Sequence, residues 1–322
     1  MASSLPNLEQ TWQFAVNQVT APQGSMTQTA AAVMFKLKNS LCTFGSNPWT
    51  VVKSSNSSTA GTSDLWTSSA AITFADAGSA HSWIVLQQAG VTGGPLQILI
   101  DCNLHIASSI TLRASPSAGF TGGSITTAPT ATDQQLLNDA NNLFLWTINS
   151  NSQTILHVIQ STTGKSTRIL VMSGGAVQSC WLFEELVDSL LTTKAVVSWT
   201  SINGSQATAF TLSGYYANAA FQGKFGANLL TAYVGTEAYN GTTVVQANSN
   251  GISNITSAYP IAALSAHSQT ASCQGRLGRF SDLYFGSPSV PTGSTYPAGG
   301  SATFAQFNPF VLPWNGTTVT IT

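Results

Sequence analysis

Apolar residues recur at helical spacing in one segment near the start of the chain. Within residues 27–41 these positions are Ala30, Met34, Leu37 and Leu41. Such spacing places the side chains on one face of an α-helix. Lys36 falls opposite that face. The pattern predicts an amphipathic helix that packs on a core through its apolar side.

A second segment, residues 181–191, also shows helical spacing. Leu182, Leu186 and Leu190 share one face, and Glu184 and Glu185 stand early in the segment. Acidic residues near a helix N-terminus complement the helix dipole. We therefore predict a second helix here, with both glutamates on its solvated side.

Most of the remaining chain consists of short apolar runs separated by Gly, Asn, Ser and Thr, which is typical of β-strands. Residues 82–88 and 96–103 flank a Gly-Gly-Pro turn, and residues 154–160 and 167–172 flank a polar turn at 162–165. Each pair predicts a β-hairpin.

A third hairpin is predicted around Asn203 and Gly204, with residues 195–202 leading in and 206–213 leading out. Strands at such short intervals indicate a mainly β fold. We expect a β-sandwich or barrel-like core with one or two short helices and long ordered loops.

Changes in composition and periodicity divide the chain into three parts. Residues 1–213 predict a β-rich core with the N-terminal amphipathic helix. Residues 214–300 are rich in Ala, Asn, Gly and Tyr with weak periodicity, which indicates a loop-rich contact region. Residues 301–322 predict C-terminal strands that return to the core, so the whole chain can form one continuous domain.

Charged residues are scarce. The chain has 322 residues, of which Lys and Arg make up 10 and Asp and Glu 11, so 7% are charged, against about 25% in ordinary soluble domains. The surface must therefore be rich in hydroxyl and amide groups. Such a surface can be buried against other subunits without desolvating ions, which suits a component of a large permanent assembly.

No apolar run is long enough to span a bilayer, and the first ten residues lack a basic and apolar leader. These features predict a protein without a membrane span that is made and assembled in a cytoplasm.

The usual catalytic and cofactor motifs are missing from the sequence. It has no Gly-x-Ser-x-Gly nucleophile motif and no Walker A loop, and its acids do not nominate a catalytic pair. The histidines, His81, His105, His157 and His267, lack metal-ligand spacing. We predict neither an enzyme nor a bound cofactor or metal.

The four cysteines are far apart and form no Cys-x-x-Cys pair; they are Cys42, Cys102, Cys180 and Cys273. This spacing favours free, mostly buried thiols over disulfides.

Basic residues form no cluster that could neutralise a nucleic-acid backbone. Arg276 and Arg279 are the nearest pair outside the first helix. We expect them to anchor a loop or an intersubunit carboxylate, with Asp282 as one candidate, and we expect no nucleic-acid partner.

Most of the eight tryptophans are embedded in strand or helix patterns, which favours packing in the core. Trp49 and Trp314 differ because each follows a proline, in Asn-Pro-Trp-Thr and Leu-Pro-Trp-Asn-Gly. We predict that these two stand on loops and belong to an interface.

Several segments together resemble a family of virion structural proteins from tailed bacteriophages. They read TWQFAVNQ at 11–18, NPWTVV at 47–52, AHSWIVL at 80–86, PTATD at 129–133 and PWNG at 313–316. None is a catalytic signature. The resemblance implies a particle component whose partners are copies of itself and other virion proteins.

Two hypotheses from different classes remain open. The first is a non-enzymatic virion building block, most simply in the tail or baseplate, with capsid decoration or a collar as the alternative location. The second is a host-recognition module that binds a surface glycan. Aromatic residues lining a groove beside two facing carboxylates would favour the second hypothesis, and broad apolar faces complementary to neighbours would favour the first.

Overall fold

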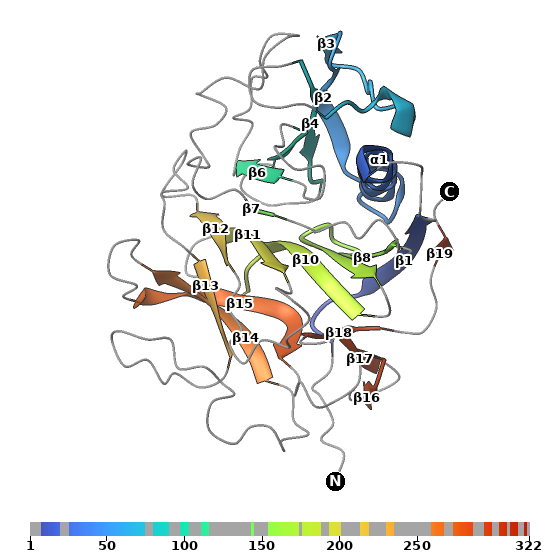
Figure 1. The fold of residues 1–322 in the computed structure, drawn as a ribbon. Helices are drawn as coiled ribbons and strands as arrows, with labels where there is room; N and C mark the ends of the chain where they lie inside the picture. Colours follow the sequence, from blue (N-terminus) through green and yellow to red (C-terminus); the bar gives the residue numbers. More distant parts are fainter. Residues whose placement is uncertain are drawn as a thin grey trace.

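The structure is a computed structural model of the chain. It describes residues 8–19, 26–74, 80–89, 97–102, 111–115, 143–144, 154–173, 176–187, 193–200, 213–218, 230–234, 259–266, 273–285, 293–297, 303–307, 310–314 and 319–320. Within these residues, two β-sheets, one α-helix and one short 3₁₀ helix make up the regular structure. Figure 1 shows the smaller sheet and the helix at the top of the view and the larger sheet below them.

The smaller sheet has six strands in the order β3-β2-β4-β5-β6-β7, and every neighbouring pair is antiparallel. Its strands are β2 (Thr50–Asn56), β3 (Ala60–Gly61), β4 (Ser82–Gln87), β5 (Gln97–Asp101), β6 (Thr111–Ser115) and β7 (Leu143–Phe144). The 3₁₀ helix η1 (Ser69–Ala71) lies in the connection between β3 and β4.

The larger sheet has thirteen strands in the order β16-β17-β18-β15-β14-β13-β12-β11-β10-β9-β8-β1-β19. Its strands are β1 (Trp12–Val19), β8 (Thr154–Ser161), β9 (Ser166–Ser173), β10 (Ala176–Glu185), β11 (Thr193–Thr200), β12 (Ser213–Asn218), β13 (Leu230–Val234), β14 (Tyr259–Ala266), β15 (Cys273–Phe285), β16 (Thr295–Pro297), β17 (Thr303–Phe307), β18 (Phe310–Pro313) and β19 (Val319–Thr320). The pairing of β1 with β19 is parallel. Neither sheet is closed into a barrel.

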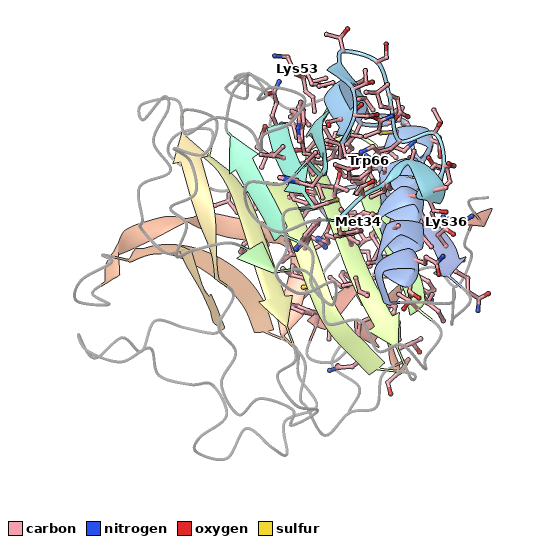
Figure 2. All side chains as sticks on the ribbon, turned by 45° about the horizontal axis from the view of Figure 1, so that its top comes forward. Met34, Lys36, Lys53 and Trp66 are labelled. Carbon is pink, nitrogen blue, oxygen red and sulfur yellow. The ribbon has the colours of Figure 1, made fainter. Side chains whose placement is uncertain are left out.

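The predicted N-terminal helix is confirmed as α1 (Met26–Thr43). All four apolar positions of its predicted face are buried, and Met34 and Leu37 are fully inaccessible. Figure 2 shows Met34 on the side of α1 that faces the sheets and Lys36 on the opposite side. Helical periodicity was therefore a sufficient signal for this element.

Two of the predicted hairpins are also confirmed. Strands β4 and β5 pair in the register Ile84↔Ile100, and strands β8 and β9 pair in the register Val158↔Ile169. In both cases the turn residues and the apolar runs around them are local signals, so the sequence contains what is needed to recognise the hairpin.

The helix predicted over residues 181–191 is wrong where the structure describes it, because Ala176–Glu185 is strand β10. Both faces of β10 are buried: Trp181 and Phe183 enter one core, and Cys180 and Leu182 enter the other. A strand buried on both faces lacks the alternation of apolar and polar residues that identifies most strands. Leucine spacing alone then resembled a helix.

The third predicted hairpin is partly different in the structure. Its first strand exists as β11, but β11 pairs with Ser213–Asn218, in the register Ala195↔Tyr216. Residues 201–212, which include the expected turn at Asn203 and Gly204, lie outside the described residues.

Segment 214–300, which the sequence suggested to be mainly loops, contributes strands to the larger sheet. Strands β13, β14, β15 and β16 lie within it, and β12 begins one residue before it. Weak periodicity concealed these strands because Ala, Gly and Asn have low β-propensity. The proposed boundaries of the three parts of the chain stay predictions.

Strands β1, β8, β9 and β10 form a central layer between two hydrophobic cores. The core shared with α1 and the smaller sheet is here called the helix-side core, and the core shared with β15, β17 and β18 is called the C-terminal core. In β9, Ile169 and Val171 enter the helix-side core, while Leu170 enters the C-terminal core. This alternation follows from the two-residue period of a strand.

The larger sheet must fold back on itself to make this arrangement. Strands β15, β17 and β18 belong to the same sheet as the central layer, yet Phe280, Leu283, Phe307 and Phe310 pack against its far face. In Figure 1, β15, β17 and β18 lie below β8 and β10, while the smaller sheet lies above them. The fold is therefore mainly β and sandwich-like, as the sequence predicted.

Candidate interaction surface

Three of the chain's few charged residues meet inside the protein, beside the C-terminal core. The Nε atom of Arg168 donates a hydrogen bond of 2.6 Å to Oε1 of Glu184, and both side chains are completely buried. Arg168 also donates to the backbone oxygens of Ser281 and Asp282. Its guanidinium carbon lies 4.3 Å from the ring centroid of Trp12. Arg168 thus connects β9, β10, β15 and β1.

The carboxylate of Asp282 holds the segment that leads into β1. It accepts hydrogen bonds from the backbone N–H groups of Glu9 and Gln10 and from the indole Nε1 of Trp12. Asp282 has a positive φ of 51°, in a part of β15 where the pairing with β14 slips between Pro260 and Ala262. Asp and Asn tolerate this left-handed conformation better than most residues. Asp282 is therefore suited both to the bend and to the contacts.

Burial raises the pKa of Glu184 above its ordinary value of 4.5, and the nearby charge of Asp282 acts in the same direction. Arg168 opposes this shift by its charge and its hydrogen bond. The Oε2 atom of Glu184 has no hydrogen-bond partner. Burial is the largest cause of the raised pKa, since removal of a carboxylate from water disfavours its charged form, and Ser166 opposes it alongside Arg168.

Sequence reasoning missed this cluster and placed Glu184 on the solvated side of a helix. One signal was present. Arg168 precedes a run of four apolar residues, and Glu184 follows another apolar run, at residues 180–183. In a chain with 7% charged residues, a charge beside a buried strand indicates a buried partner. The identity of that partner required the fold, because Asp282 is 114 residues from Arg168.

The exposed residues that the structure describes are almost all uncharged. Glu9 and Asp64 are the charged ones among them, and every other exposed position holds Thr, Ser, Gln, Gly or Ala. Asp64 also forms a salt bridge, since its Oδ2 lies 2.7 Å from Nζ of Lys38. For this part of the chain, the expectation of a surface rich in hydroxyl groups is confirmed, while Gln18 and Gln28 are the exposed amides among the described residues.

The densest part of this surface covers β2, β3 and η1, at the top of Figure 1. Its exposed residues are Thr50, Ser58, Thr59, Gly61, Thr62, Ser63, Asp64, Thr67, Ser68, Ala70 and Thr73. Lys53, labelled in Figure 2, is half-buried on β2. Beneath this surface, Trp66 is fully buried and its Nε1 donates to the backbone oxygen of Ser55 at 2.9 Å.

Trp49 is not an exposed loop residue, which corrects the expectation from the sequence. It is 1% exposed, and its ring lies 5.1 Å from that of Phe183 in an edge-to-face arrangement. Its Nε1 donates to the hydroxyl of Thr167 at 3.2 Å. Trp49 therefore belongs to the helix-side core, although it follows a proline.

Trp314 is half-buried at the edge of the C-terminal core. Its ring lies edge-to-face against Phe14, His157 and Phe307, with centroid separations of 5.6, 5.5 and 5.3 Å. Part of the side chain stays accessible, so its role in an interface remains a prediction. Most of its packing nevertheless serves to hold the end of β18 on the central layer.

Arg276 and Arg279 both lie on strand β15, where their backbones pair with Leu264 and Ala262 of β14. Their side chains lie outside the described residues, so their predicted role as anchors stays a prediction. The described hydrogen bonds of the Asp282 carboxylate are with Glu9, Gln10, Trp12 and Ser281.

The described residues contain no group of three His, Cys, Asp or Glu side chains that could hold a metal ion. Cys42, Cys102 and Cys180 are thiols that form no disulfide in the described part of the chain, as predicted. Burial raises the pKa of the Cys42 thiol to about 12, so the thiolate needed for nucleophilic chemistry is not formed at neutral pH.

No family model matches the sequence, and neither a curated protein nor a solved structure shows significant similarity to the chain. None of the helices that the structure describes combines the length and hydrophobicity needed to cross a membrane.

Proposed function

We propose that this chain is a non-enzymatic structural component of a tailed-bacteriophage virion, located in the tail or baseplate. In this proposal it is assembled in the cytoplasm of the host bacterium and contacts other copies of itself and other virion proteins. The proposal begins from the resemblance of five segments to phage virion proteins, and the following observation supports it.

The main observation in support is that charged side chains are buried while most exposed positions are neutral. Arg168, Glu184 and Asp282 are buried and paired, while the exposed described positions, apart from Glu9 and Asp64, hold hydroxyl, amide and small side chains. A neutral polar surface can be buried in a subunit contact at a low desolvation cost, because no ion has to leave water. The same surface would give an isolated protein little charge repulsion to keep it dispersed.

Quantitative mass spectrometry of purified particles tests this proposal. We expect the chain at a constant ratio to the other particle proteins, through successive purification steps that reduce host proteins. Separate tail and head fractions then test the location. Enrichment in the tail fraction supports a location in the tail or baseplate, whereas enrichment in the head fraction indicates a decoration or collar protein. Loss of the chain during purification would contradict a structural role.

A further inference from the structure

The N-terminal segment, residues 8–11, is attached to the protein largely through one carboxylate. It precedes β1 and belongs to no helix or strand. The backbone N–H of Glu9 donates to both oxygens of Asp282, at 2.9 and 3.1 Å, and the N–H of Gln10 donates to Oδ2 at 3.1 Å. The side chain of Gln10 adds contacts of 3.2 and 3.5 Å with two hydroxyl groups near the turn between β8 and β9. Asp282 thus accepts three of the described hydrogen bonds that hold this segment.

Asp282 belongs to a buried cluster that contains more acidic than basic groups. Arg168, Glu184 and Asp282 are each at most 1% exposed. If both carboxyl groups were ionised, the cluster would carry one positive and two negative charges. A net charge inside a protein is disfavoured, because an ion removed from water needs a partner of opposite charge. A single proton bound to one of the carboxyl groups would make the cluster neutral.

The hydrogen bonds of the cluster indicate which carboxyl group holds this proton. Both oxygens of Asp282 accept from N–H groups, so a proton on either oxygen would displace a donor. In Glu184, Oε1 accepts from Arg168, while the buried Oε2 has no hydrogen-bond partner among the described residues. A proton on Oε2 therefore breaks no described bond. Burial raises the pKa of Glu184, which agrees with a proton at this position.

The other described charges around the cluster leave this count unchanged. Lys165 and Glu185 pair with each other at 2.7 Å, and the side chain of Glu9 is exposed to water. Burial lowers the pKa of His157 on β8 to about 4, so this residue is neutral above about pH 5. Strands β1, β17 and β18 contain no charged residue. On β15, Asp282 is the charged residue whose side chain the structure describes.

We propose that a proton on Glu184 controls the attachment of residues 8–11 to Asp282. While Glu184 is neutral, the charge of Arg168 balances that of Asp282 and the segment stays attached. Loss of the proton places a second negative charge in the buried cluster. Release of the segment then relieves the repulsion, because it exposes Asp282 to water. Residues 8–11 are the part that moves, since they belong to no strand. This pH-dependent attachment does not depend on the proposed function.

Hydrogen exchange of the Glu9 and Gln10 amides measures the attachment, because Asp282 accepts from these two N–H groups. The attached state binds the proton of Glu184 more tightly than the released state, so attachment is strongest in acid and weakens as pH rises. After correction for base catalysis, we expect the protection factors to fall between about pH 5 and about pH 9, by up to about tenfold per pH unit. Amides of β4 should stay far more protected at every pH, which shows that the segment opens locally.

Two variants and one spectrum make the test specific. Glu184→Gln is always neutral and can still accept from Arg168, so its Glu9 and Gln10 amides should keep a high protection that does not change with pH. Glu185→Gln is the matched control and should retain the fall seen in the original chain. Infrared spectroscopy needs no variant. The carbonyl band of one protonated carboxyl group should persist above the pH at which exposed carboxyl groups ionise, and disappear where the protection falls.

The proposal is overturned if the protection of the two amides in the original chain does not change with pH, or if Glu184→Gln shows the same fall. It is also overturned if Glu185→Gln abolishes the fall, or if β4 and the segment lose protection equally. Absence of the protonated carboxyl band would likewise contradict it. These outcomes are separate from the proposed function, which depends on the presence of the chain in particles.

Discussion

The indole Nε1 of Trp12 donates a hydrogen bond of 2.9 Å to the carboxylate of Asp282, across 270 residues of sequence. Trp12 also lies under the guanidinium group of Arg168. The first strand of the larger sheet is thereby fixed to the bend in β15. Because the contact involves a buried carboxylate and a buried arginine, its loss should be costly.

Replacement of Asp282 by Asn should destabilise the fold. Asn tolerates the positive φ at this position, so the change isolates the loss of the negative charge. One amide N–H group would then face the donors of Glu9, Gln10 and Trp12. We expect the free energy of unfolding to fall by about 2–4 kcal/mol. Urea denaturation measures it, and an unchanged midpoint would contradict the anchoring role.

Replacement of Glu184 by Gln should alter how stability depends on pH. The raised pKa of Glu184 means that the folded chain binds a proton more readily than the unfolded chain. The contribution of Glu184 to stability is therefore greatest at acidic pH, and it falls as pH rises from the unfolded pKa through the folded pKa. In Glu184→Gln the amide oxygen can still accept from Arg168, but the titration is lost.

We therefore expect the free energy of unfolding of Glu184→Gln, relative to that of the original chain, to be lowest at acidic pH. This difference should shift in favour of the variant as pH rises. Denaturation curves at several pH values measure the difference. Glu185→Gln is the matched control on the neighbouring residue, where the partner is the partly exposed Lys165. Parallel pH profiles for the original chain and Glu184→Gln would refute the prediction.

Replacement of His157 by Phe should improve stability in acid. Burial lowers the pKa of His157 from 6.5 to about 4, so the unfolded chain binds the proton more readily. The original chain loses stability through this group as pH falls from 6.5 towards 4, by up to about 3 kcal/mol. Phe keeps the aromatic packing on Phe307 and Trp314 but does not titrate.

The measurement is the melting temperature of both chains at pH 7 and at pH 4.5. We expect the advantage of His157→Phe to be larger at the lower pH. An equal difference at the two values would show that protonation of His157 does not oppose folding.

Two glycine substitutions should have opposite effects. Gly164 has a φ of 75°, and a Cβ atom there would lie 2.5 Å from the backbone oxygen of Ala89. We expect Gly164→Ala to destabilise the chain by about 1–3 kcal/mol. Gly61 has open space and no positive φ, so Gly61→Ala should be neutral or stabilise by up to about 1 kcal/mol. Thermal denaturation of both variants measures the contrast, and equal effects would contradict it.

Several elements could be predicted from the sequence because their signals are local. Helix α1 shows its apolar face within 15 residues of chain, at 27–41, and the β4–β5 and β8–β9 hairpins combine apolar runs with turn residues. The scarcity of charge similarly predicted the neutral surface that the described residues show. Composition alone decides this property, because a chain with few charges cannot cover its surface with them.

Only the tertiary structure decided the features that depend on how distant strands meet. Strand β10 resembled a helix because both of its faces are buried, and Trp49 resembled Trp314 because both follow proline. Their different burial depends on which layer covers them. Likewise, Arg168, Glu184 and Asp282 become partners only when the larger sheet folds back on itself. Sequence periodicity predicts which residues are buried. Which residues they pack against is determined by how the layers of the fold are arranged.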